Sequence, residues 1–146
     1  MIHNLEQYND SQDVPNNEMR GIYGESPAEG RYAAFKVLGD SMDDGTIEGF
    51  RKGSILKCRE LQKGHWQTSL NFKDFPYWVI YTKHARLPLV KQIIEHNSQD
   101  GYILCHSLNN DLRYRNFQLE LNDIQAMFYV TSEVIIRAKD FIYYIR

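Results

Sequence analysis

Ser41 lies in a short segment, 39–45 (Gly-Asp-Ser-Met-Asp-Asp-Gly), that directly follows a run of strand-forming residues. Loops presented at strand ends often carry functional residues. Two familiar chemistries do not fit this segment. A calcium-binding EF-hand loop needs an oxygen ligand where Met42 stands, and a nucleophile elbow needs glycine where Asp43 stands. What remains is a serine on a tight turn, which is either a capped turn or a nucleophile.

Lys91 is the second residue with unusual surroundings. In the run 87–95 the side chains alternate across a predicted strand, which puts Lys91 on one face with Leu89 and Ile93. A lysine among aliphatic residues either extends its ammonium to water at the edge of a sheet or lies in a dry site. In a dry site burial lowers the pKa of the amine, and a neutral amine is a competent general base for a serine.

The other residue types that bind metals or act as catalytic partners form no recognisable pattern. The five histidines show no ligand spacing, and Cys58 and Cys105 are far apart in the sequence, so we expect no metal site and no cofactor. No spacing selects one histidine as the partner of a serine. The cluster Arg113-Tyr114-Arg115 is more typical of a solvated hairpin than of a nucleic-acid-binding patch.

The elements that must position Ser41 and Lys91 are predicted to be strands. Short runs rich in Val, Ile, Tyr and Phe alternate with clusters of Gly, Asn and Asp, which predicts a mainly β domain. Asp100-Gly101 between two such runs is a strong hairpin signal, and a weak helical tendency is confined to 119–127. The expected strands are 32–37, 54–59, 77–82, 87–96, 102–106, 117–121, 127–136 and 141–145.

The long segment 60–76 carries three aromatic residues, Trp66, Phe72 and Phe75, among polar ones. These rings either cap one end of the β domain or form a wall for a substrate or partner.

Composition and charge exclude several classes of protein. The chain has 146 residues, 42% hydrophobic and 25% charged, as in ordinary globular domains. It lacks both an apolar run of roughly 18 to 20 residues and a secretory signal, so we expect a cytoplasmic protein outside the membrane. Residues 1–30 carry six acids and one base, whereas 31–146 carry thirteen acids and sixteen bases. This predicts a loose acidic arm, 1–30, and one domain, 31–146, that does not bind duplex DNA directly.

Three stretches in order resemble the LexA/UmuD family of self-processing serine peptidases, related to the C-terminal domains of phage repressors. Residues 35–42 (Phe-Lys-Val-Leu-Gly-Asp-Ser-Met) are similar to the family's nucleophile motif. Residues 89–94 (Leu-Val-Lys-Gln-Ile-Ile) are similar to the strand that bears its lysine base. Residues 101–110 (Gly-Tyr-Ile-Leu-Cys-His-Ser-Leu-Asn-Asn) resemble the strand and turn that follow. The likeness covers about residues 32–136.

The resemblance implies a fold like the LexA C-terminal and signal-peptidase domains, with small packed β-sheets. It implies Ser41 as nucleophile, Lys91 as base, and an oxyanion site formed by backbone N–H groups at Ser41 and Met42. It further implies a homodimer. The apolar and aromatic residues of 134–136 and 141–145 are the expected dimer contact, and the alternative is that they pack within the chain's own core. The implied peptide substrate is the chain's own N-terminal arm, cleaved within a bacterial or phage stress (SOS) or transcription-regulatory system.

The sequence departs from the family pattern in three ways. A thirty-residue acidic arm cannot hold the helix-turn-helix domain of the repressors. The scissile Ala-Gly or Cys-Gly is absent from its expected place near Glu6. The stretch from Ser41 to Lys91 is longer than usual, and Gly53-Ser54 replaces Gly-Asp.

Two functions follow from these observations. The leading hypothesis is a Ser–Lys peptidase domain, and any cut should fall between Arg20 and Gly30 in the acidic arm. The alternative is a non-catalytic dimerisation or partner-binding module of the same fold.

Overall fold

The computed structural model describes residues 5–7, 29–68, 70–137 and 142–145, and within them the regular structure is mainly β. The two helices there are short 3-10 turns, η1 (Lys63–His65) and η2 (Leu121–Asp123), and neither has the length and apolar character needed to cross a membrane. The strands are β1 (Leu5–Gln7), β2 (Glu29–Val37), β3 (Ile55–Leu61), β4 (Tyr77–Thr82), β5 (Leu89–Asn97), β6 (Tyr102–His106), β7 (Phe117–Glu120), β8 (Ile124–Arg137) and β9 (Ile142–Ile145).

Each expected strand is present, and β4 and β6 have the predicted bounds. The weak helical tendency at 119–127 corresponds to η2. The Asp100-Gly101 hairpin joins β5 to β6: Gly101 has a φ of 77°, and its N–H donates to the Asn97 carbonyl over 2.8 Å. Glycine suits this position because a positive φ costs it little.

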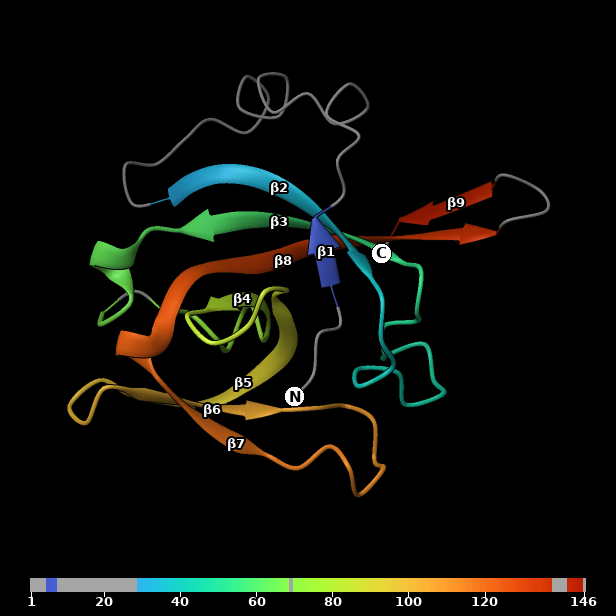
Figure 1. The fold of residues 1–146 in the computed structure, drawn as a ribbon. Coiled ribbons are helices and arrows are strands. Elements are labelled where there is room, and N and C mark those ends of the chain that lie inside the picture. Colours follow the sequence, from blue (N-terminus) through green and yellow to red (C-terminus); the bar gives the residue numbers. More distant parts are fainter. Residues whose placement is uncertain (1–4, 8–28, 69, 138–141, 146) are drawn as a thin grey trace.

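The described strands form one continuous antiparallel sheet in the order β1-β2-β3-β8-β4-β5-β6-β7, with β9 paired to β8. Figure 1 shows this sheet curling, with β8 running between β3 and β4. The expectation of several small packed β-sheets is therefore corrected, because the described strands belong to one sheet. β8 is 14 residues long and pairs with β3 on one edge and with β4 on the other. It therefore joins strands β1–β3 to strands β4–β7 by hydrogen bonds.

The expected N-terminal arm, 1–30, is not loose throughout. Leu5–Gln7 pair with residues 35–37 of β2, and β2 itself begins at Glu29. The remainder of the arm, including the expected cut region from Arg20 to residue 28, lies outside the described residues.

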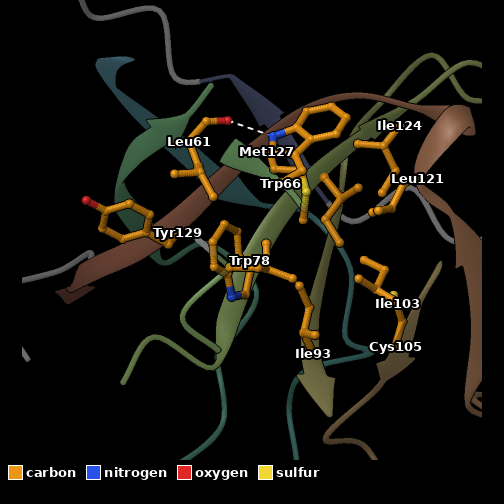
Figure 2. Close-up of a cluster of buried hydrophobic side chains, with 12 residues drawn as sticks. Leu61, Trp66, Trp78, Ile93, Ile103, Cys105, Leu121, Ile124, Met127 and Tyr129 are labelled. Carbon is orange, nitrogen blue, oxygen red and sulfur yellow. Dashed lines mark hydrogen bonds between the residues drawn. The ribbon is translucent and has the colours of Figure 1, made fainter. Parts of the chain in front are cut away.

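One hydrophobic cluster fills the inside of the curl, and Figure 2 shows its indole rings and aliphatic side chains packed together. Trp66 is 3% exposed, and its Nε1–H donates to the Leu61 carbonyl over 2.8 Å. Phe72 and Phe75 pack against the same cluster. The aromatic residues of the 60–76 segment therefore cap this core. A second cluster includes Phe35 of β2 and Phe128 of β8 together with Met42 from the segment between β2 and β3.

Candidate active site

Ser41 lies on a turn that the rest of the fold holds firmly. The Asp43 N–H donates to the Asp40 carbonyl over 3.0 Å, which closes the turn. The Phe50 N–H donates to the Met42 carbonyl over 2.7 Å, and the Met42 side chain is buried in the second cluster. The turn that follows β2 therefore has one defined position for the Ser41 hydroxyl.

Lys91 comes from strand β5 and lies within hydrogen-bonding distance of Ser41. It lies on β5 opposite Trp78 of β4, and its Nζ is 2.9 Å from Ser41 Oγ and 2.8 Å from Ser107 Oγ. Ser41 and Lys91 are both 0% exposed. The Ser41–Lys91 distance lies within the reach that a dyad requires, and the alternative that the ammonium extends to water is wrong.

Burial controls the protonation of Lys91. Desolvation lowers the pKa of its amine from 10.5 to about 8, because the ammonium form is costly away from water. Burial also raises the pKa of the nearby Cys105 thiol to about 12, so this thiol stays protonated while Lys91 titrates. Among the described residues no carboxylate forms a salt bridge with Lys91. The lowered pKa therefore gives Lys91 a neutral fraction near physiological pH that becomes the major form above about pH 8.

The loop between β6 and β7 closes over the site, although no site role was expected for its residues. The Asn109 N–H donates to the Ser41 carbonyl, and its side-chain amide donates to the Asp40 carbonyl, each over 2.9 Å. The Tyr114 hydroxyl donates to the Asp40 carboxylate, and the Tyr114 ring centroid lies 5.9 Å from Lys91 Nζ. Tyr114 is therefore part of the cover of the site rather than only part of a solvated hairpin.

The Met42 N–H is a candidate donor for an oxyanion. It donates no hydrogen bond to any residue that the structure describes, so it is available to an incoming carbonyl oxygen. Within the described part of the chain, no three His, Cys, Asp or Glu side chains form a metal-ligating group. The chemistry that this arrangement offers is proton transfer between an amine and a hydroxyl.

Comparisons of the chain with protein-family models, with curated proteins and with solved structures find no match. The function of the site must therefore be argued from its geometry and from the residue pattern alone.

Proposed function

We propose that this chain is a LexA/UmuD-like Ser–Lys peptidase domain and that its fold is a variant of that family's fold. The observation that carries the proposal is the buried Lys91 amine between two hydroxyls, 2.9 Å from Ser41 and 2.8 Å from Ser107. Lysine is rarely fully buried without a charged partner, so its burial here needs a reason. General-base catalysis supplies that reason, because the base must be neutral to accept a proton.

In the proposed reaction the neutral Lys91 amine takes the proton from Ser41 as Oγ bonds to the carbonyl carbon of a peptide. The resulting oxyanion accepts a hydrogen bond from the Met42 N–H, and one such donor contributes roughly 2.7–4 kcal/mol in a well-studied serine protease. The C–N bond then breaks, and the Lys91 ammonium returns its proton to the leaving amine. Water hydrolyses the acyl-enzyme by the same steps in reverse order, with Lys91 again as base.

Ser107 acts as a positioning residue in this mechanism. A neutral amine has two N–H groups and one lone pair. When one N–H donates to Ser107 Oγ, the lone pair can face the hydroxyl hydrogen of Ser41. The short Nζ–Oγ distances on both sides support this division of roles.

The proposed substrate is the chain's own acidic arm, cut between Arg20 and Gly30. The proposal includes a cytoplasmic homodimer in a stress or transcription-regulatory system, with contacts along the C-terminal residues 134–136 and 141–145. In the described part of this region, β9 pairs with β8 of the same chain from Val134 to Arg137. A second copy would therefore add to this hairpin rather than replace it.

One observation favours the alternative, a non-catalytic dimerisation or partner-binding module. Ser41 and Lys91 are both 0% exposed, and the Tyr114–Asp40 contact covers them. A peptide can reach Ser41 only if this cover moves.

Intact-mass spectrometry of the purified protein after alkaline incubation distinguishes the two functions. A peptidase loses a single N-terminal fragment, and Ser41→Ala stays intact because the nucleophile is gone. Ser98→Ala, which removes an exposed serine, is the matched control and should be cut like the wild type. An unchanged mass throughout supports the module, and a cut that persists in Ser41→Ala overturns self-processing.

A further inference from the structure

The loop between β6 and β7 has a tip, residues 110–115, that is held together by its own hydrogen bonds. The Tyr114 N–H donates to the Asp111 carbonyl over 2.9 Å, and the Arg113 N–H donates to the Asp111 carboxylate over the same distance. The Arg113 Nε lies 3.1 Å from that carboxylate. Because these contacts lie within the tip, the tip can keep its shape when it moves.

The base of the loop is fixed on both sides of the tip. At one end, Asn109 donates two hydrogen bonds to the turn that follows β2. At the other end, Asn116 Oδ1 lies 2.6 Å from Nδ1 of His106 in β6. Figure 1 shows the loop in orange, extending beyond the ends of β6 and β7. Motion of the loop would therefore be confined to the tip between Asn109 and Asn116.

Little attaches the tip itself to the rest of the molecule. Its residues are exposed apart from the half-buried Tyr114, and Leu112 is 83% exposed. In the described parts of the chain, one hydrogen bond joins the tip to a segment outside its own loop: the Tyr114 hydroxyl donates to the Asp40 carboxylate. Asp40 is exposed as well, so water competes for this bond. A single hydrogen bond of modest strength therefore links the tip to the turn that carries Ser41.

Tyr114 also lies over the proposed base. Its ring centroid is 5.9 Å from Lys91 Nζ, and Lys91 is 0% exposed. Desolvation is the largest cause of the lowered pKa of Lys91, so moving the ring aside would admit water and raise that pKa. A closed tip therefore keeps the amine dry and at the same time keeps a peptide away from it.

We propose that residues 110–115 form a lid over the Ser41–Lys91 dyad, and that the Tyr114–Asp40 hydrogen bond keeps this lid closed until a peptide takes its place. The inference rests on the proposed peptidase function and adds a means of regulation to it: the dyad is assembled but covered, and opening of the lid limits access to Ser41. Lids of this kind open in microseconds to milliseconds and often set the rate of an enzyme.

The test measures how often Lys91 becomes exposed, by reductive methylation with formaldehyde and cyanoborohydride at about pH 8 and peptide mapping by mass spectrometry. All variants carry Ser41→Ala, so that no cleavage occurs during labelling. Tyr114→Phe keeps the ring and loses the hydroxyl, and it should speed methylation of Lys91 roughly threefold to tenfold, as expected for the loss of one hydrogen bond. Asp40→Ala removes the other partner and should have the same effect, with no further gain in the double variant.

Two controls make the result specific. Lys36, which is exposed on β2, should be methylated at the same rate in every variant. Tyr102→Phe removes another tyrosine hydroxyl that donates to a carboxylate, that of Glu95 over 2.9 Å, and should leave Lys91 protected. In the chain with its nucleophile intact, Tyr114→Phe should cut the arm faster by a similar factor, because the lid opens more often.

Unchanged methylation of Lys91 in Tyr114→Phe would overturn the lid, and so would an equal increase in Tyr102→Phe. A fall in the urea midpoint of Tyr114→Phe large enough to explain the whole increase would overturn it as well, because the exposure would then come from unfolding. The two proposals fail separately. Faster methylation without arm cleavage in any variant would support the lid and reject the peptidase, whereas cleavage by the wild type with unchanged methylation would do the reverse.

Discussion

Replacing Lys91 by Met tests the protonation of the proposed base without requiring any catalytic assay. Met has a similar length and no charge, so the variant removes the buried amine and its hydrogen bonds to Ser41 and Ser107. The lost hydrogen bonds change the free energy of unfolding by an amount that does not depend on pH. The lost ionisation changes it by an amount that does.

The pH-dependent part follows from the two pKa values of Lys91, 10.5 in the unfolded chain and about 8 in the folded one. Below about pH 8 both states hold the proton, and the folded state carries the full cost of the buried ammonium. Between about 8 and 10.5 only the unfolded state holds it, so wild-type stability rises with pH by about 1.4 kcal/mol per pH unit. Over this interval the wild type should gain about 3 kcal/mol relative to Lys91→Met.

Urea denaturation followed by tryptophan fluorescence measures this gain, because Trp66 and Trp78 are both buried in the core. Lys36→Met, which removes an exposed lysine of β2, is the matched control and should show no comparable change with pH. A constant difference between Lys91→Met and the wild type from about pH 7 to about pH 10 would refute the argument. Lys91 would then have no lowered pKa and no special fitness as a base.

Four further outcomes are expected. The rate of arm cleavage, measured by intact mass, should rise with pH and level off above about 8, because Lys91 must first lose its proton. Ser107→Ala should slow cleavage by about tenfold and shift the midpoint of that pH profile, and Ser107→Thr should restore both, since the 2.8 Å hydrogen bond orients the amine. Gly101→Ala should lower the free energy of unfolding in urea by about 1 kcal/mol, because its φ of 77° strains alanine while an added Cβ meets no atom within 4 Å. Light scattering at micromolar concentration should report a dimer, and a monomer there would contradict the proposed C-terminal contact.

The strands were predictable because they are encoded by residue types that lie next to one another in the sequence. Each run is rich in Val, Ile, Tyr or Phe and is bounded by turn residues, and the turn residues Asp100-Gly101 lie next to each other in the sequence. The order of the strands was not predictable in this way. β8 pairs with β3 and β4, whose partner residues precede those of β8 by about forty residues or more, and no local pattern encodes that choice.

Ser107 shows why part of the site escaped prediction. Counting back from the Asp100-Gly101 hairpin with regular pairing puts Lys91 opposite Leu108. A register shift between Ile93 and Glu95 moves the pairing by one residue, so that Gln92 pairs with His106, and the adjacent Lys91 lies 2.8 Å from Ser107 Oγ. Such irregularities depend on how the whole sheet curls. Tyr114 is a similar case, because its contact with Asp40 joins residues 74 positions apart.

The pairing of β1 with β2 has a consequence for any cut between Arg20 and Gly30. β1 and β2 anchor both ends of the connecting residues 8–28, which gives this segment a high effective concentration near its own domain. Cleavage within one molecule would then proceed at a rate that does not depend on protein concentration. After the cut, the part of the released fragment that the structure shows paired with the domain is β1, which has three residues. A strand of three residues gives little affinity of its own once the covalent link is lost, so the β1–β2 pairing would not by itself hold the fragment in place.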